Sequence, residues 1–276
     1  MPELPEVETV IRDLKAHRLV GSEIRAVTVR WPRMVSNGTP ASLASALIGR
    51  TLVGVSRRGK YILLTLDNGA CLHVHLRMTG KFRFEQKGTS AGPHDHVTLT
   101  LGDGRRLLFN DTRKFGRFRL VPKGVDGLAH LGPDAMDKSF TVAVLRQRLS
   151  GRRRMIKPLL LDQTILAGLG NIYVDESLWA AGLHPRRHAD TLGEDEIHRL
   201  FRAIRLVLRR AVSNGGTTLG RGRTNFYSVA GRRGRNAGQL KVFRREGESC
   251  FRCGTRIVRT VVGQRGTHVC PACQKD

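Results

Sequence analysis

The chain has 276 residues, long enough for two domains of ordinary size, and 40% of them are hydrophobic, enough to build cores. Lys and Arg outnumber Asp and Glu by 48 to 23, a net charge of +25. An excess of this size indicates a polyanionic partner, because each neutralised phosphate releases counterions. No apolar stretch approaches the ~18 residues of a membrane span, and no basic-then-apolar signal segment opens the chain. We therefore expect a cytosolic protein that binds nucleic acid.

The first segment, MPELPEVETVIRDL, predicts an amphipathic helix over about residues 5–18. Pro5 suits a first helical turn and the acidic residues beside it suit the positive end of the helix dipole. Apolar residues follow at helical spacing as far as Leu14. These preferences leave one feature unexplained, which is the pair Pro2 and Glu3 ahead of the helix.

Residues 24–120 read as strands with alternating apolar and polar residues, separated by Gly, Asn or Asp turns. This alternation favours a two-layer antiparallel sandwich over a parallel sheet. Helical patterns follow, as far as about residue 213. The Gly- and Arg-rich run 214–238 has little apolar material to anchor it, which predicts a long mobile loop that orders on a ligand.

The predicted organisation has four parts. They are an N-terminal sandwich domain (1–125), a hinge (126–140), a helical domain that includes the Gly- and Arg-rich loop (141–240), and a C-terminal zinc ribbon (241–276).

The ribbon is predicted from four of the five cysteines, which form two Cys-x2-Cys pairs separated by sixteen residues. They are Cys250, Cys253, Cys270 and Cys273. This spacing is typical of one tetrahedral zinc ion, and four thiolates leave no open position, so the metal is expected to be structural. Two disulfides are the alternative, which a reducing compartment disfavours.

Three motifs, taken together and in this order, carry a family resemblance. They are MPELPEVETV, LLLDQTILAGLGNIYVDESLW, and the terminal cysteine pattern with QRGTHVC inside it. The whole chain resembles the formamidopyrimidine-DNA glycosylase family, and its start resembles that branch more than the endonuclease VIII branch, which usually begins MPEGPE. The resemblance implies an α+β fold, with an antiparallel β-sandwich, a helix–two-turn–helix domain and a four-cysteine zinc ribbon.

The resemblance also explains the chain start. A reference α-amino group, with a pKa of ~7.7–8.0, is roughly a tenth neutral at pH 7, against ~0.04% for a reference Lys. An N-terminal amine is therefore a more available nucleophile for a Schiff base than a lysine. The resemblance implies that Met1 is removed, that Pro2 is the nucleophile, and that Glu3 is the general acid/base beside it. It further implies that Lys60 and Arg265 assist catalysis at the phosphates near the lesion.

Further residues are implied as DNA contacts, although composition alone would make most of them surface charges or core residues. The implied DNA contacts are His75, His94, Arg113, Arg152, Lys157, Asn171 and Arg259. The residues implied to fill the space left by a flipped base are Met78, Arg113 and Phe115. The residues implied to cover the flipped base are Thr217, Thr218 and Arg223. Asp162 and Glu176 are expected to hold the helix–two-turn–helix motif together.

The chain departs from the family pattern at three places. Phe243, Arg244 and Arg245 stand where Tyr-Gly-Arg is common, Arg77 stands where some members have Gly, and Thr112 replaces a frequent Pro. The expected protein is a monomeric, zinc-containing glycosylase and abasic-site lyase of base-excision repair that acts on oxidised purines in double-stranded DNA. The alternatives are the same chemistry on oxidised pyrimidines, and a catalytically inactive protein that binds damaged DNA.

Overall fold

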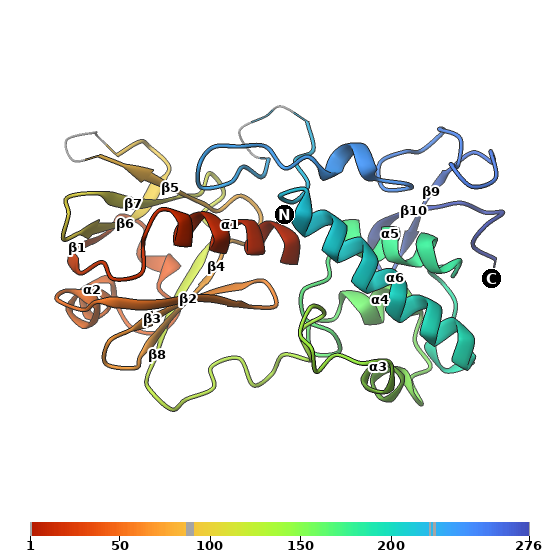
Figure 1. The fold of residues 1–276 in the computed structure, drawn as a ribbon, viewed down its shortest axis with the longest axis horizontal. Coiled ribbons are helices and arrows are strands. Elements are labelled where there is room, and N and C mark those ends of the chain that lie inside the picture. Colours follow the sequence, from red (N-terminus) through yellow and green to blue (C-terminus); the bar gives the residue numbers. More distant parts are fainter. Residues whose placement is uncertain (1, 87–90, 221, 223–224, 276) are drawn as a thin grey trace. The chain divides into compact units, whose positions relative to one another are not determined.

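The computed structural model describes residues 2–86, 91–220, 222 and 225–275 (Figure 1). The chain forms two compact units. The first contains the residues up to Leu128 together with Asn214–Arg235, and the second contains Ala129–Ser213 and Asn236–Asp276. The Gly- and Arg-rich loop, grouped with the helical domain in the sequence-based division, thus contacts the N-terminal unit most extensively.

The first unit is an antiparallel β-sandwich with one long helix, α1 (Leu4–Ala16), packed on it (Figure 1). One sheet has the strand order β1-β6-β7-β5 and the other β2-β3-β4-β8. Their bounds are β1 (Ile24–Val29), β2 (Leu52–Arg58), β3 (Tyr61–Leu66), β4 (Cys71–His75), β5 (Lys81–Glu85), β6 (Asp95–Leu101), β7 (Arg106–Asn110) and β8 (Arg117–Val121). Every paired strand is antiparallel, which confirms the predicted sandwich.

The alternation of the strands puts their apolar residues inside. On β3, Ile62, Leu64 and Leu66 are at most 1% exposed, while the residues between them are half-buried. The apolar stripe of α1 closes the same core with Val7 and Leu14, both fully buried.

A short helix in this unit, α2 (Pro40–Leu47), was missed by the strand-based prediction. Its local signal is a capping box, in which the Thr39 hydroxyl accepts from the Ser42 amide at 3.1 Å and the Ser42 hydroxyl accepts from the Thr39 amide at 2.9 Å. Pro40 at the first helical position strengthens that signal.

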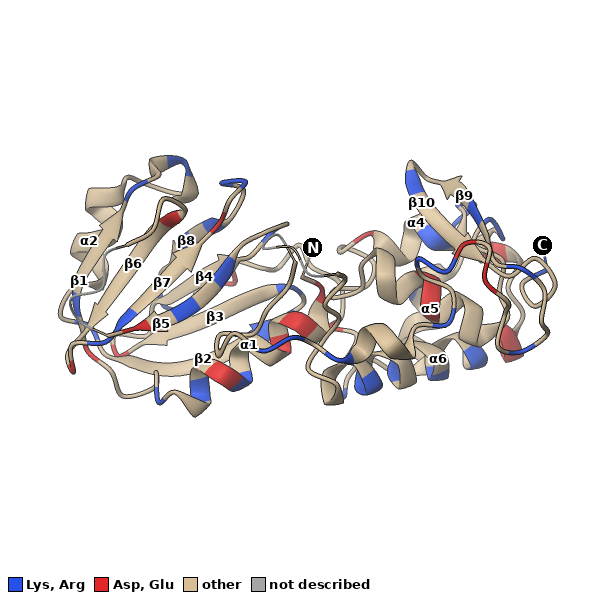
Figure 2. Cartoon of the chain, turned by 90° about the horizontal axis from the view of Figure 1, so that it is seen from above, with Lys and Arg blue, Asp and Glu red and all other residues tan. Residues whose placement is uncertain are grey.

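The second unit is helical apart from one hairpin. Its elements are α3 (Val142–Leu149), α4 (Ile156–Leu161), α5 (Asn171–Ala181), α6 (Glu194–Ser213), β9 (Val258–Val262) and β10 (Arg265–Val269). Helix α5 starts at Asn171, directly after Gly170, and it ends at Ala181 with Gly182 as its C-cap, whose φ of 71° suits a residue without Cβ. Figure 2 shows Lys and Arg positions spread over both units rather than confined to one segment. Within the part of the chain that the structure describes, no helix is both long and apolar enough to span a membrane.

Candidate active site and nucleic-acid interface

The start of the chain is held in place by one buried carboxylate. Glu6, 1% exposed, accepts from the Glu3 amide at 2.8 Å with Oε2 and from the Thr217 amide at 2.7 Å with Oε1. Glu3 is itself 2% exposed and completes a reciprocal capping box with Glu6. Glu6 therefore links the segment that carries Pro2 to the Gly- and Arg-rich loop.

Lys60 occupies the turn between β2 and β3 and is only 6% exposed, whereas a lysine at the end of a strand is usually solvated. Arg57 ties this turn to α1, because its Nε donates to Glu8 at 2.9 Å and its Nη1 donates to the Gly59 carbonyl at 3.2 Å. The two implied catalytic segments, the start of α1 and the Lys60 turn, are thus braced against each other by Arg57.

His75 is held as a neutral ring at the end of β4. Its Nδ1 accepts from the Arg77 amide at 2.9 Å, and its ring meets that of Tyr61 edge-on at 4.7 Å. Burial, and then the positive charges of Arg77 and Lys60, lower the pKa of His75 to about 3. With Nδ1 accepting, the proton lies on Nε2, which remains a donor for a ligand.

Three exposed side chains from two loops form one cluster, which we call the wedge cluster (Met78, Arg113 and Phe115). Met78 and Phe115 are 40% and 43% exposed, so neither is the core residue that composition alone suggests. The guanidinium of Arg113 lies over the Phe115 ring at 4.8 Å and donates to the Met78 sulfur at 3.6 Å. The backbone of the exposed His94 lies beside the start of the loop that carries Arg113, since its carbonyl accepts from the Asp111 amide at 2.9 Å.

The described part of the Gly- and Arg-rich loop is anchored, contrary to the sequence-based expectation. Asp13 on α1 accepts from the Ala230 amide at 3.1 Å and from Arg232 at 2.9 Å, and Val229 enters the core. The expectation considered only apolar anchors, whereas Asp13 and Glu6 supply polar ones.

The two threonines implied to cover a flipped base are buried, at 4% for Thr217 and 1% for Thr218. The Thr218 hydroxyl donates to the Phe226 carbonyl and accepts from the Gly234 amide, so it holds the two arms of the loop together. Arg223 and Met1 lie outside the described residues.

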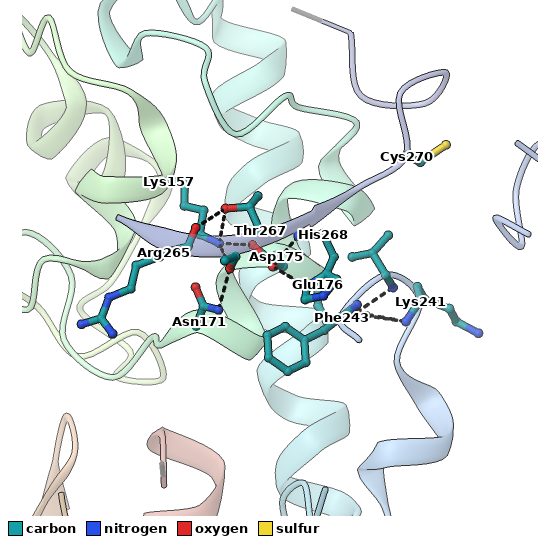
Figure 3. Close-up of polar contacts among 12 residues, drawn as sticks. Lys157, Asn171, Asp175, Glu176, Lys241, Phe243, Arg265, Thr267, His268 and Cys270 are labelled. Carbon is teal, nitrogen blue, oxygen red and sulfur yellow. Dashed lines mark hydrogen bonds and ion pairs between the residues drawn. The ribbon is translucent and has the colours of Figure 1, made fainter. Parts of the chain in front are cut away.

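In the second unit, Lys157 has an internal role instead of the predicted DNA contact. Its side chain is fully buried, and its Nζ donates to Asp175 at 2.6 Å, to the Thr267 hydroxyl at 2.8 Å and to the Gly266 carbonyl at 3.1 Å (Figure 3). All three ammonium protons are committed, so none is available to a phosphate. Asp175 also accepts from the His268 amide at 3.0 Å.

This network fixes β10 immediately after Arg265. The hairpin turns through Gly263 and Gln264, both with positive φ, as a two-residue turn between antiparallel strands requires. Arg265 is exposed and points away from the Lys157 network (Figure 3). Asn171 donates from Nδ2 to the Gly266 carbonyl at 2.9 Å, so the first residue of α5 lies against the same hairpin.

Arg259 on β9 and Arg152 after α3 are also exposed. Arg152 donates to the Arg148 carbonyl at 2.9 Å. Their DNA contacts stay predictions.

Asp162 holds its own turn of the motif together, as expected, whereas Glu176 binds a segment outside the motif. Glu176 accepts from the amides of Lys241, Val242 and Phe243 at 2.8–3.0 Å and thereby anchors the segment before the ribbon. Asp162 accepts from both the amide and the hydroxyl of Thr164.

The departures from the family pattern now have a structural setting. Phe243 is buried with its ring 5.1 Å from that of His268, and Arg244 beside it has a φ of 59°. Arg77 has a φ of 54°. Arg77 and Arg244, at positions where Gly is expected in some family members, thus adopt a left-handed conformation that disfavours any residue with a Cβ.

The four ribbon cysteines form the metal site. Their sulfurs all lie within 4.8 Å of one another, with 3.9 Å between Cys250 and Cys273 and 3.4 Å between Cys253 and Cys270. Sulfurs around a tetrahedral zinc ion at ~2.3 Å are roughly 3.8 Å apart, whereas a disulfide needs ~2.05 Å. The Cys250 sulfur also accepts from Trp179 Nε1 at 3.4 Å, an outer contact that steadies a thiolate ligand. The set fits a structural zinc ion.

Comparison with known proteins agrees with this architecture in all three of its parts. Residues 1–118 match the formamidopyrimidine-DNA glycosylase N-terminal domain, residues 131–222 its H2TH domain, and residues 247–275 the zinc finger found in FPG and IleRS. A formamidopyrimidine-DNA glycosylase from Protochlamydia amoebophila is 43% identical over 275 residues, which cover 100% of both chains.

Solved structures agree as well. A complex between Lactococcus lactis Fpg and an abasic site containing DNA is 38% identical, with a TM-score of 0.90 and 100% of both chains covered. MutM in complex with carbocyclic 8-oxo-G containing DNA gives the same identity, TM-score and coverage. The chain described here is therefore a zinc-containing DNA-repair glycosylase, and it belongs to the formamidopyrimidine-DNA glycosylase family.

Proposed function

We propose that this glycosylase excises oxidised purines from double-stranded DNA and then cleaves the strand as an abasic-site lyase, acting as a monomer. The observation that carries the proposal is the arrangement at the chain start, where Pro2 and Glu3 are buried and Glu6 holds them against the loop at Thr217. Relatives of this chain have been solved with DNA containing carbocyclic 8-oxo-G and with DNA containing Fapy-dG, which supports oxidised purines as the substrate class.

Removal of Met1 frees the secondary amine of Pro2. Its nitrogen forms a bond to the sugar C1′ as the bond from C1′ to the base breaks, and the base leaves with a proton. Glu3 protonates the sugar oxygen as the ring opens, which gives a Schiff base. Loss of a C2′ proton breaks the bond to the 3′ phosphate, and a second proton loss breaks the bond to the 5′ phosphate. Water then releases Pro2 and leaves a one-nucleotide gap.

Other residues supply charge and shape. Lys60, Arg265 and the neutral His75 would hold the phosphates around the extruded nucleotide, and the wedge cluster would fill the space it leaves. The backbone amide of Thr217 lies beside Glu6 at 2.7 Å. We expect the enzyme to associate with the nucleoid through its positive charge.

Borohydride trapping tests the mechanism on duplex DNA with 8-oxoguanine opposite cytosine, followed by peptide mapping of the adduct. We expect an adduct at Pro2 that is lost in Pro2→Gly and in a form with Met1 retained. An adduct on abasic DNA but not on the 8-oxoguanine duplex would favour oxidised pyrimidines as the substrates and retain the lyase activity. Tight binding without any adduct would make the protein a binder of damaged DNA and overturn the lyase mechanism.

A further inference from the structure

The two loops that carry the wedge cluster share one buried carboxylate. Asp111, fully buried, accepts with Oδ1 from the Thr79 hydroxyl and from the Arg113 amide at 3.2 Å, and with Oδ2 from the Gly116 amide at 2.7 Å. Thr79 directly follows Met78, and Gly116 directly follows Phe115. The Thr79 hydroxyl also accepts from the Arg113 amide at 3.3 Å, so the two loops are bonded to each other as well as to Asp111.

The same loops close on one core ring. A Cβ at Gly80 would lie 2.5 Å from Phe109 Cζ, and a Cβ at Gly116 would lie 2.4 Å from Phe109 Cε1. Phe109 is fully buried, so neither loop can move inward and no larger side chain fits between loop and ring. The Asp111 carboxylate and the Phe109 ring together fix the bases of both loops.

Each of the two loops contains a residue in a left-handed backbone conformation that its side chain disfavours. Arg77 has a φ of 54° and directly precedes Met78, while Lys114 has a φ of 59° and directly precedes Phe115. A left-handed conformation at a residue with a Cβ persists only where the surrounding contacts enforce it. The bonds to Asp111 are such contacts.

We propose that Asp111, together with Thr79, positions the wedge cluster so that Met78, Arg113 and Phe115 enter the base stack as one preformed unit. This inference rests on the proposed role of the cluster in filling the space of a flipped base. Asp111 touches neither DNA nor the reacting atoms in this scheme. It sets the geometry of side chains that do, and side chains already ordered lose less entropy on insertion.

Positioning of the wedge cluster matters only where its side chains must enter a stack of paired bases. On duplex DNA the wedge cluster replaces the extruded base, whereas a single strand with an abasic site presents no stacked partner to displace. A change that loosens the two loops therefore lowers activity on duplex DNA and leaves activity on the single strand unchanged. A change that damages the fold or the catalytic residues lowers both.

The test compares Thr79→Val with its matched control Thr79→Ser, which keeps the hydroxyl. The substrates are a duplex with 8-oxoguanine opposite cytosine and a single strand with an abasic site. We expect Thr79→Val to lower kcat/KM on the duplex about tenfold, the weight of one buried hydrogen bond, and to keep single-strand activity within about twofold. Thr79→Ser stays at the wild-type value on both substrates. Asp111→Asn should also lower activity on the duplex but not on the single strand, with a larger loss than Thr79→Val. If Asp111→Asn does not fold, the comparison of Thr79→Val with Thr79→Ser is sufficient for the test.

A 2-aminopurine next to the lesion gives a readout that does not require catalysis. Binding of the wild-type protein should raise the fluorescence of the 2-aminopurine. Thr79→Val should give a smaller rise when the DNA is saturated with protein. Equal losses on duplex and single strand, or no loss in Thr79→Val on either substrate, would overturn the inference. A wild-type protein that raises the fluorescence but forms no borohydride adduct would overturn the proposed lyase activity and retain the positioning role.

Discussion

Lys157 provides the strongest single test of what holds the second unit together. Lys157→Met keeps the length of the side chain but removes an ammonium that donates to three acceptors at 2.6–3.1 Å. Both Lys157 and Asp175 are fully buried, so the substitution leaves a carboxylate without its countercharge in the interior. Breaking a buried pair from one side costs about 3–5 kcal/mol of unfolding free energy.

The matched control is Arg154→Met, three residues earlier. Its guanidinium lies 3.7 Å from Asp162, and the two side chains are 56% and 30% exposed. An exposed pair of this kind contributes about 0–1 kcal/mol. Replacing both buried partners, Lys157→Met with Asp175→Leu, should recover part of the loss because no uncompensated charge remains.

Urea unfolding followed by Trp179 fluorescence in a Trp31→Phe background measures the second unit alone, since Trp179 lies on α5 and Trp31 in the first unit. The expected order of stability is wild type, Arg154→Met, the double variant, then Lys157→Met. If Lys157→Met lost no more stability than Arg154→Met, the network would not hold β10 in place. DNA affinity should fall with Lys157→Met, because β10 carries Arg265.

Three further predictions follow from the same structure. Burial lowers the pKa of His75 to about 3, so between pH ~6.5 and ~3 the unfolded chain binds a proton that the folded chain does not. Folding stability should therefore be lost as the pH is lowered through this range, by up to ~1.4 kcal/mol per pH unit, and His75→Asn should reduce the slope of urea midpoints against pH. Arg77→Gly and Arg244→Gly should each raise the free energy of unfolding by about 0.5–1 kcal/mol in the same urea assay, because glycine relieves the left-handed strain, whereas Arg244→Ala should not. Cys250→Ser should abolish the single equivalent of zinc measured with a metallochromic dye and lower DNA affinity, because the ribbon that carries Arg265 loses its metal.

The features that the sequence predicted correctly are those set by neighbours in the chain. The alternation along residues 61–66 defines a strand with one buried face, because successive side chains point to opposite sides. The glycines before Asn171 and at Gly182 define the ends of α5. The paired Cys-x2-Cys spacing brings four sulfurs within 4.8 Å. In each case a short-range rule decides the outcome, so composition and spacing are sufficient.

The features that the sequence did not predict depend on partners far apart in the chain. The amide that Glu6 binds is 211 residues away, the carbonyl that Lys157 binds is 109 residues away, and the hydroxyl that Asp111 binds is 32 residues away. From sequence alone, a carboxylate or ammonium group is interpreted as a surface charge. Only the fold shows which distant partner pairs with it and that both groups are buried away from water. By itself, therefore, the sequence determined the sandwich strands, the zinc ligands and the family, but not the short helix α2. Only the tertiary structure decided that Lys157 is internal, that the Gly- and Arg-rich loop is anchored on α1, and that the wedge cluster shares one buried carboxylate.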